Sequence, residues 1–303
     1  MTSYSLPTRR RFALGERATR TLFIVPALAI FTIVMLVPVA MNAGYAFTDW
    51  NGFTQDFGWV GLANFAHIGA DVATRTAFVN TLVFTAINAP LQILIGLILA
   101  LSLRSTSRFI VGVRLIVVMP IAVSGVVLGF IGTIIFDPRT GILAALAEST
   151  GLEFIGANWL GDPKLAMAAV IAMNLWQWSG FTMLIFLAGL TSIPEELYEA
   201  AQLDGASRWQ QFSQITWPLL SPAATINIVL TLIGGLKIFD VVYVLTGGGP
   251  GDATRTVVMR VVTQGATSNY GYSASISVTL TILTMIVALV ALAVLRRREA
   301  RNS

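Results

Sequence analysis

The sequence contains no cysteine, only one histidine and few charged residues. Without cysteine the chain forms no disulfide, no thiolate metal site and no cysteine nucleophile, and His67 alone cannot build a histidine cluster for a catalytic metal. We therefore expect neither catalytic nor metal-ligating residues. Only 11% of the 303 residues are charged, whereas soluble globular proteins carry about 25%. Because 55% of the residues are hydrophobic, the composition indicates an integral membrane protein.

Uncharged stretches long enough to cross a bilayer occur six times, since a transmembrane helix needs about 20 predominantly apolar residues. Pro218 and Pro222 place the start of the fifth helix near residue 216, and polar Thr263–Ser275 places the start of the sixth near Ile276. We therefore expect an all-α membrane protein with six transmembrane helices. The expected parts are a tail over 1–20, a transmembrane domain over 21–295 with helices near 21–48, 76–103, 115–136, 165–191, 216–236 and 276–295, and a tail over 296–303.

Positive charge is distributed unequally between alternate segments of the chain. Thirteen of the nineteen lysines and arginines lie in the two tails and in the connections after the second and fourth helices. Cytoplasmic flanks of membrane helices carry excess lysine and arginine. Both termini are therefore expected in the cytoplasm, with connections 49–75, 137–164 and 237–260 outside. The net charge of +4 is explained by this pattern, and we expect no nucleic-acid partner.

The expected helices also lack groups that transporters working alone commonly carry. None has an acidic or basic residue near its centre, whereas proton-coupled carriers hold carboxylates there and voltage sensors hold arginines. No Gly-Lys dipeptide occurs in the sequence, which excludes a Walker A phosphate loop. If ATP drives this protein, the ATPase is therefore another chain.

The connection after the fourth helix is acidic, although its side of the membrane is otherwise basic. Ser192 and Glu195 have the spacing of a capping box, which predicts a short helix from about residue 193 to 203, and Gly205 can end it. Ser207 and Gln210 repeat the pattern. Residues 192–215, the elbow, are thus predicted to form two short helices around a glycine. An acidic helix is repelled by anionic lipid, so the elbow favours a protein partner.

The elbow also resembles a known signature. Its residues, with Pro218 after them, are similar to the EAA motif of binding-protein-dependent ABC importer permeases, although Trp217 replaces the family's leucine. The resemblance implies a type I ABC importer permease fold whose cytoplasmic coupling helix inserts into an ATP-binding subunit. The coupling residues that it implies are Glu199, Ala200, Ala201, Asp204, Gly205, Ala206, Ile215 and Pro218.

Other segments resemble the carbohydrate branch of that family. Lys237–Gly251 is similar to the outer end of the fifth helix in sugar permeases, and Trp50–Gly52 and Val60–Phe65 extend the likeness. Without the family, the three glycines before Pro250 predict a turn with positive φ. The resemblance implies a bacterial inner-membrane protein without a cofactor of its own. The implied partners are a second homologous permease, two ATP-binding subunits that hold ATP and Mg, an extracytoplasmic solute-binding protein and a sugar-like solute.

A hydrophilic solute crossing a helical bundle needs polar side chains that face an internal cavity. The fourth helix offers amides interleaved with tryptophans, a mixture that suits sugars. The same residues also suit hydrogen bonding and close packing between helices, and Lys237 and Asp240 are spaced to pair with each other. The candidates are Asn174, Trp176, Gln177, Ser179, Gly180, Asn227, Lys237 and Asp240, with Asn88, Gln92, Ser275 and Ser277 as weaker ones.

The sequence therefore favours the permease subunit of an ATP-driven importer that moves a sugar or related polyhydroxy solute inward by alternating access. The alternative is a secondary transporter or channel that works alone. A membrane enzyme ranks last because no helix carries a plausible cluster of acids, histidine or metal ligands. The sequence does not distinguish a mono-, di- or oligosaccharide from a polyol or glycerol phosphate.

Overall fold

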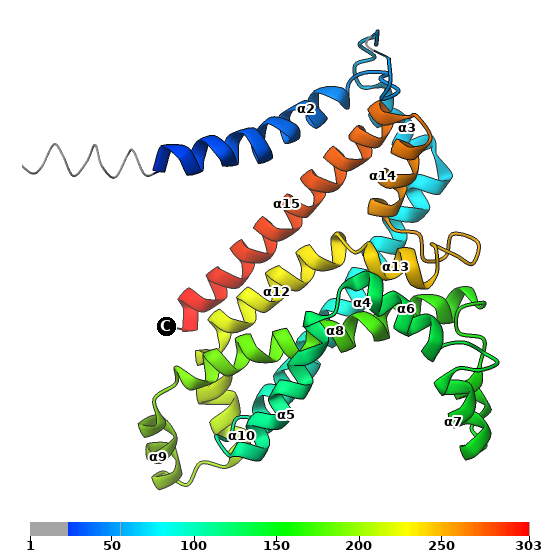
Figure 1. The fold of residues 1–303 in the computed structure, drawn as a ribbon. Helices are drawn as coiled ribbons and strands as arrows, with labels where there is room; N and C mark the ends of the chain where they lie inside the picture. Colours follow the sequence, from blue (N-terminus) through cyan, green and yellow to red (C-terminus); the bar gives the residue numbers. More distant parts are fainter. Residues whose placement is uncertain (1–23, 55, 303) are drawn as a thin grey trace, which may run out of the picture.

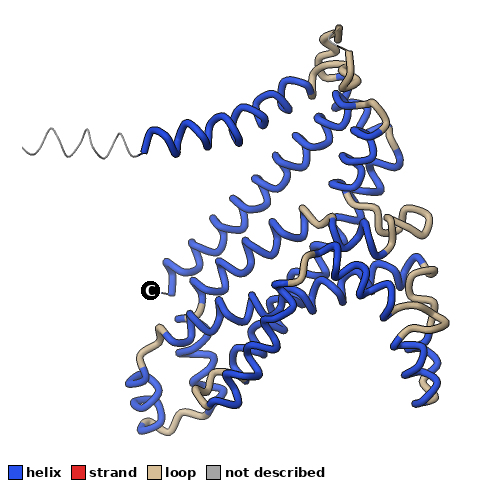
Figure 2. The backbone as a smooth tube through the Cα atoms, viewed as in Figure 1, coloured by secondary structure: helices blue, strands red, loops and turns tan. Residues whose placement is uncertain are grey.

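The computed structural model describes residues 24–54 and 56–302. The expected N-terminal tail, with its arginines, and the first three residues of the first expected helix lie outside the described residues. Helices account for most of the described chain, and the loops between them are short or confined to the two ends of the bundle (Figure 2). The described part has no β-strand beyond an isolated bridge between Thr48 and Trp59.

Within the described residues, four helices are long and apolar enough to cross a membrane, and two bent helix pairs raise the number to six if each pair is one span. The long helices are Ile24–Tyr45, which contains the π-helical turn η1 (Thr32–Leu36) and α2 (Val37–Tyr45), α4 (Val72–Ser102), α8 (Pro163–Thr191) and α15 (Tyr270–Asn302). The bent pairs are α5 (Arg108–Val118) and η2 (Met119–Ala122) with α6 (Gly125–Ile135), and α10 (Arg208–Gln211), η4 (Phe212–Thr216) and α11 (Trp217–Leu219) with α12 (Ser221–Leu236).

The third expected span is not one straight helix over 115–136. It begins earlier, at Arg108, and bends by 103° between η2 and α6. Val123 is extended at the break, and the Ser124 hydroxyl accepts a hydrogen bond from the Val127 amide at 3.3 Å, so that Ser124 caps a new helix. Pro120, which has no amide hydrogen to donate, lies in the 3₁₀ turn before the break. The uniformly apolar run concealed this break.

Two other helices begin before their expected residues. Asp71 caps α4 by accepting a hydrogen bond from the Ala73 amide at 3.0 Å, so α4 begins at Val72 rather than near residue 76. The sixth helix begins at Tyr270 rather than near Ile276. Its polar first turn is tolerated because the Ser273 hydroxyl donates to the Val261 carbonyl in the preceding helix α14 (Val257–Ala266). The helix also continues through most of the expected C-terminal tail.

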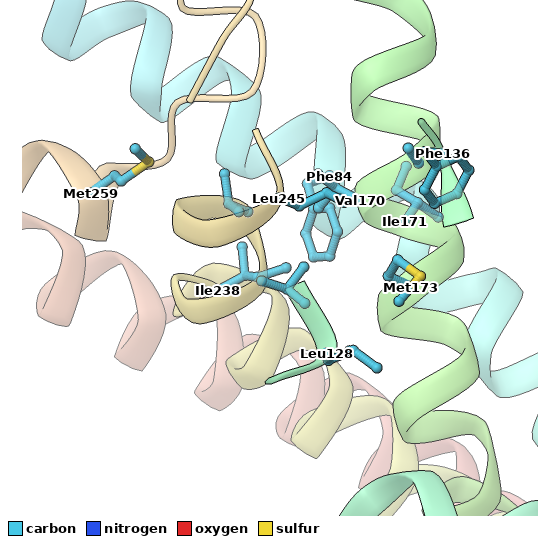
Figure 3. Close-up of a cluster of buried hydrophobic side chains, with 12 residues drawn as sticks. Phe84, Leu128, Phe136, Val170, Ile171, Met173, Ile238, Leu245 and Met259 are labelled. Carbon is cyan, nitrogen blue, oxygen red and sulfur yellow. The ribbon is translucent and has the colours of Figure 1, made fainter. Parts of the chain in front are cut away.

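One half of the bundle has a core formed by α4, α6, α8 and α13 (Asp240–Leu245). Phe84, Leu128, Val170 and Leu245 come together there from four helices (Figure 3). Glycines bring α6 close to α13: a Cβ at Gly129 would lie 2.6 Å from the Val244 Cβ. A second core, formed mainly by α4, α8 and α12, fills the other half, toward the elbow.

The helices spread apart toward the chain ends. The first long helix meets α15 at its carboxyl end and otherwise lies away from the bundle (Figure 1). None of its most apolar stretch is buried. The carboxyl end, α9 (Glu195–Leu203) and α10 lie toward one end of the long helices. Helices α3 (Ala63–Ala70), α13 and α14 lie toward the other end, while α7 (Ile142–Thr150), which is followed by the short helix η3 (Glu153–Gly156), projects to one side. The chain therefore keeps the elbow and its carboxyl end together.

Candidate functional site

A cavity of about 410 Å³ lies between α4, α8, α12, the start of α6 and the segment that joins α12 to α13. Its position within the bundle allows polar side chains to face an enclosed space instead of lipid. Five amide side chains line it: Asn88, Gln92, Asn174, Gln177 and Asn227. The other polar or aromatic lining residues are Trp178, Phe181, Thr182, Thr231, Lys237, Phe239 and Asp240.

Three of the amides join the helices of the cavity wall. The Asn88 Nδ2 donates to Gln92 Oε1 at 3.1 Å, and the Gln92 Nε2 donates to Thr182 Oγ1 at 2.9 Å. The Asn227 Nδ2 donates to the Thr182 carbonyl at 3.3 Å. Thr182 thus links α4 and α12 to α8. Asn88 is 1% exposed, and its Oδ1 has no hydrogen-bond partner among the described residues. The network therefore stabilises the wall and leaves one buried acceptor unsatisfied.

The two remaining amides of α8 have different surroundings. The Gln177 Nε2 donates to the Val123 carbonyl at 2.8 Å, which satisfies a backbone group exposed by the break in the third span. Asn174 is half-buried and has no side-chain hydrogen bond within the described chain. Of the two, Asn174 has an amide that is free to bind a ligand, while the Gln177 amide stabilises the cavity wall.

Three of the α8 candidates lie outside the cavity lining. The indole of Trp176 is 47% exposed on another side of the helix. The Ser179 hydroxyl donates to the Leu175 carbonyl of its own helix at 2.6 Å. A Cβ at Gly180 would overlap the Val117 carbonyl oxygen of α5. The geometry of Ser179 and Gly180 is that of helix packing. Ser275 and Ser277 also lie outside the lining.

Helix spacing was a signal for the lining that the sequence reasoning did not use. Asn174, Gln177, Trp178 and Phe181 follow the i, i+3, i+4, i+7 pattern of one helix face, and all four line the cavity. Asn227, Leu230, Thr231 and Gly234 repeat the pattern on α12. A periodicity search for polar faces would have added Trp178, Phe181 and Thr231 and removed Trp176.

The break in the third span and the segment that follows the fifth span meet at the cavity. The chain is non-helical between Leu236, the end of α12, and Asp240, the start of α13, and a Cβ at Gly125, the first residue of α6, would lie 2.6 Å from the Asp240 Cβ. Lys237 and Asp240 are both exposed and both line the cavity. The ion pair that their spacing allowed is absent from the described contacts. One cationic and one anionic group are therefore available in the cavity wall.

The turn after α13 has the conformation that its glycines predict. Gly247, Gly248 and Gly251 have φ angles of 61°, 87° and 57°. The Asn80 Nδ2 donates to the Asp252 carbonyl at 2.7 Å and to the Arg255 carbonyl at 3.1 Å. The turn is thus attached to α4 through Asn80.

The elbow forms two short helices around Gly205, whose φ is +78°. The second capping box is present, because the Ser207 Oγ accepts from the Gln210 amide at 3.3 Å and the Gln210 Oε1 accepts from the Ser207 amide at 2.7 Å. The first is not: the Ser192 hydroxyl donates to the Gly189 carbonyl at the end of α8, and the helix begins at Glu195 after an extended Pro194. The Ser192 hydroxyl therefore bonds to the Gly189 carbonyl of the preceding helix instead of capping α9.

The elbow presents a mixed acidic and apolar surface. No residue of α9 is buried, and Leu203 is 90% exposed. Glu199, Ala200 and Asp204 are exposed, whereas Ala201, Ala206, Ile215 and Pro218 are half-buried. Trp209, which follows the second cap, is also exposed. Exposed apolar side chains among acids suit a protein surface that carries apolar pockets and positive charge.

Comparison with known proteins finds relatives that are all described as membrane components of transport systems. Residues 92–301 match the family described as binding-protein-dependent transport system inner membrane component. A probable ABC transporter permease protein, PH1215 of Pyrococcus horikoshii, is 38% identical over 88% of this chain and 92% of its own length. The trehalose/maltose transport system permease protein MalF of Thermococcus litoralis is 31% identical over 92% of this chain and 94% of its own.

A further relative is the multiple sugar-binding transport system permease protein MsmF of Streptococcus mutans, which is 32% identical over 91% of this chain and 95% of its own. Among solved structures, a chain of a bacterial ABC transporter that imports the acidic polysaccharide alginate has a TM-score of 0.82 at 22% identity. The match covers 96% of this chain and 99% of that one. At this identity the structural likeness concerns the fold.

Proposed function

This chain belongs to the family of binding-protein-dependent transport system inner membrane components and is a permease subunit of an ABC importer, and we propose that it moves a sugar or related polyhydroxy solute inward by alternating access. Its fold is the all-α, type I ABC importer permease fold. The observation that carries the choice of solute is the cavity lined by five amides and three aromatic rings.

The chemistry of the cavity supports a polyhydroxy solute. Amide groups both donate and accept hydrogen bonds, as hydroxyl groups do, and the rings of Trp178, Phe181 and Phe239 offer flat apolar surfaces. The volume of about 410 Å³ lies within the range of small-molecule sites, about 300 to 1,000 Å³. The names of the MalF and MsmF relatives refer to trehalose, maltose and multiple sugars, which supports the same class.

Within the cavity, we assign solute contact to the groups that line it and have unused hydrogen-bonding capacity. Asn174, Lys237 and Asp240 form no described side-chain hydrogen bond or ion pair, and Asn88 has a free acceptor. Asn227 and Gln177 line the cavity but already bond to helices, so their assigned role is both structural and solute-facing. We assign Ser179 and Gly180 to packing, and Trp176 to the outer surface of α8.

We assign the elbow to coupling with a separate ATP-binding subunit. Its exposed acids and apolar side chains would contact that subunit, and Gly205 would keep the two short helices at a fixed angle. ATP and Mg would bind to the partner, so that this chain performs no covalent chemistry. The proposed coupling residues are Glu199, Ala200, Ala201, Asp204, Gly205, Ala206, Ile215 and Pro218.

The proposed assembly pairs this chain with a second, related permease, two ATP-binding subunits and an external solute-binding protein. The relatives' family name refers to a binding protein. Both termini and the elbow would face the cytoplasm, where ATP is available. The cavity would open alternately to the two sides as the fourth and fifth spans rock.

The proposal is tested with the complete transporter in proteoliposomes. We expect an ATPase and a second permease to co-purify with this chain, and radiolabelled sugars offered with the binding protein to accumulate when ATP is supplied. Asn174→Ala should reduce uptake, whereas Ser179→Ala should not. Uptake without any ATPase chain would instead establish a secondary transporter, and uptake of only charged, hydroxyl-free solutes would refute the sugar assignment.

Two glycines with the same backbone conformation separate coupling from general strain. Gly205 has φ +78° and Gly151 has φ +71°, and a Cβ meets no atom within 4 Å at either. A residue other than glycine costs about 1–2 kcal/mol there. We expect Gly205→Val and Glu199→Ala to abolish uptake and uncouple ATP hydrolysis, while Gly151→Val on the outer side remains coupled. Normal uptake in Gly205→Val would refute the coupling role.

A further inference from the structure

Tyr198 is the residue of α9 whose side chain reaches another helix. Its hydroxyl lies 2.9 Å from the Thr216 Oγ1 of η4. No other α9 side chain makes a hydrogen bond within the described residues, and none is buried. Among the described hydrogen bonds, the pair of Tyr198 and Thr216 is therefore the one that joins an α9 side chain to the fifth span.

Thr216 is positioned to receive that contact. It is buried, and its hydroxyl donates to the Gln211 carbonyl, five residues earlier, at 3.3 Å. Because the Thr216 proton is used in this way, the Tyr198 hydroxyl is the donor to Thr216. Consecutive hydrogen bonds of this kind polarise and strengthen one another. The Tyr198 proton thus connects α9 to the backbone of the π-helical turn.

The π-helical turn η4 is followed by the bend of the fifth span. A π-helical turn inside a helix is uncommon and is frequently found at functional sites. After it the chain bends by 64° into α12, which carries Asn227 and Thr231 in the cavity wall. A displacement applied at Thr216 therefore acts on the base of a helix that lines the solute cavity.

Tyr198 also contacts the end of a second cavity helix. The guanidinium carbon of Arg104 lies 5.9 Å from the centre of the Tyr198 ring, within the range of a cation–π contact. Arg104 follows α4, which ends at Ser102 and carries Asn88 and Gln92. One tyrosine thus contacts both η4, which leads into α12, and Arg104, which follows α4.

From these contacts we propose that Tyr198 is the positioning residue that transmits movement of α9 to the fifth span through Thr216. This inference rests on the proposed coupling role of the elbow and deepens it. Ring and hydroxyl have separate tasks: the ring holds the end of α4, and the hydroxyl moves the π-helical turn. Loss of the hydroxyl alone uncouples the cavity from the ATP-binding subunit without removing the surface that the subunit binds.

The test follows cavity opening directly and needs no knowledge of the solute. The natural chain has no cysteine, so Leu230→Cys, which lines the cavity, gives one thiol. The complete transporter carries this thiol in proteoliposomes with ATP and vanadate inside, and a membrane-impermeant maleimide is added outside. ATP should accelerate labelling. Tyr198→Phe and Thr216→Val should each reduce that acceleration about five-fold, the effect of losing one hydrogen bond of about 1 kcal/mol.

Matched variants separate transmission from structure. Thr216→Ser retains the hydroxyl and should restore ATP-dependent labelling. Tyr45→Phe removes a tyrosine hydroxyl that makes no described hydrogen bond, and should leave labelling unchanged. The double variant Tyr198→Phe/Thr216→Val should resemble either single variant. ATP hydrolysis and co-purification of the ATPase should persist throughout.

Three outcomes would overturn the inference. Unchanged ATP-dependent labelling in Tyr198→Phe, with loss of coupling in Gly205→Val, would refute transmission through Tyr198 and leave the elbow's role intact. Loss of ATPase co-purification in Tyr198→Phe would show that the hydroxyl merely maintains the docking surface. Absence of any ATPase from the wild-type complex would refute both the inference and the proposed function.

Discussion

The Asp71 carboxylate lies 2.7 Å from the Arg260 guanidinium, and this ion pair joins the start of α4 to α14. Both side chains are 14% exposed. The same carboxylate accepts hydrogen bonds from the hydroxyls of Thr74 at 2.6 Å and Tyr272 at 3.0 Å. The starts of α4 and α15 and the helix α14 therefore meet at one carboxylate, which the sequence reasoning did not single out.

The first prediction concerns the stability provided by this pair. Asp71→Asn leaves the Arg260 guanidinium largely buried without a counter-ion, a change that costs about 3 kcal/mol in buried pairs. Asp252→Asn is the matched control, because the Asp252–Arg255 pair is 38% and 26% exposed and such surface pairs contribute about 1 kcal/mol or less. Thermal unfolding of the purified protein should show a clearly larger loss for Asp71→Asn. Equal losses would contradict the prediction.

The second prediction is the pH range over which that pair stabilises the fold. Burial acts to raise the pKa of Asp71, but hydrogen bonds from Thr74, Arg260 and Tyr272 and the charge of Arg260 outweigh it and hold the pKa well below its usual range. A lowered folded-state pKa stabilises above the unfolded-state value, about 3.9, and that stabilisation is lost only as pH falls below it. The stability difference between wild type and Asp71→Asn should therefore stay constant between pH 7 and pH 5. A difference that shrinks within this range would contradict the low pKa.

The third prediction tests the close packing of α6 on α13. Gly129→Ala places a Cβ 2.6 Å from the Val244 Cβ, which is fixed to the backbone, whereas a Cβ at Gly112 in α5 meets no atom within 4 Å. Both substitutions gain helix propensity of about 1 kcal/mol, but overpacking at Gly129 costs about 1–3 kcal/mol. Unfolding measurements should show Gly129→Ala less stable than Gly112→Ala. If the two behave alike, the helices are not in close contact.

Local patterns predicted the parts of the fold that depend on neighbouring residues. The six apolar stretches, the Ser207–Gln210 cap and the end of α9 before Gly205 each follow from a few adjacent positions. The break at Val123 does not, because its carbonyl is satisfied by Gln177, 54 residues later in the chain. A helix break that is stabilised by a hydrogen bond from a distant helix leaves no signal in the residues around it.

The candidate site was predicted in part for the same reason. Asn174 and Asn227 were identified because amides are rare in apolar runs. Thr182, which receives hydrogen bonds from two other helices, was missed because a threonine inside a span is unremarkable by composition. Ser179 has a polar side chain but satisfies it within its own helix. Residue type gives hydrogen-bonding capacity, whereas only packing decides whether that capacity faces a cavity.

The fourth prediction concerns the orientation of the chain in the membrane. Because the natural chain lacks cysteine, single thiols can be labelled without background. Phe53→Cys lies in the loop between α2 and α3, and Thr106→Cys lies in the turn between α4 and α5; both positions are exposed. A membrane-impermeant maleimide should label Phe53→Cys in intact cells and Thr106→Cys only after the membrane is opened. The reverse pattern would refute the cytoplasmic assignment of the elbow.

The fifth prediction separates solute contact from structural support on α8. Asn174 lines the cavity without a described hydrogen bond, whereas Gln177 satisfies the Val123 carbonyl at 2.8 Å. Asn174→Ala should raise the KM for uptake and leave thermal unfolding unchanged. Gln177→Ala leaves a half-buried carbonyl unpaired, which costs about 1 kcal/mol, and should lower the unfolding midpoint. Gln177→Glu, whose carboxylate cannot donate to that carbonyl, should be at least as unstable. A stable Gln177→Ala variant with a raised KM would instead place Gln177 among the solute contacts.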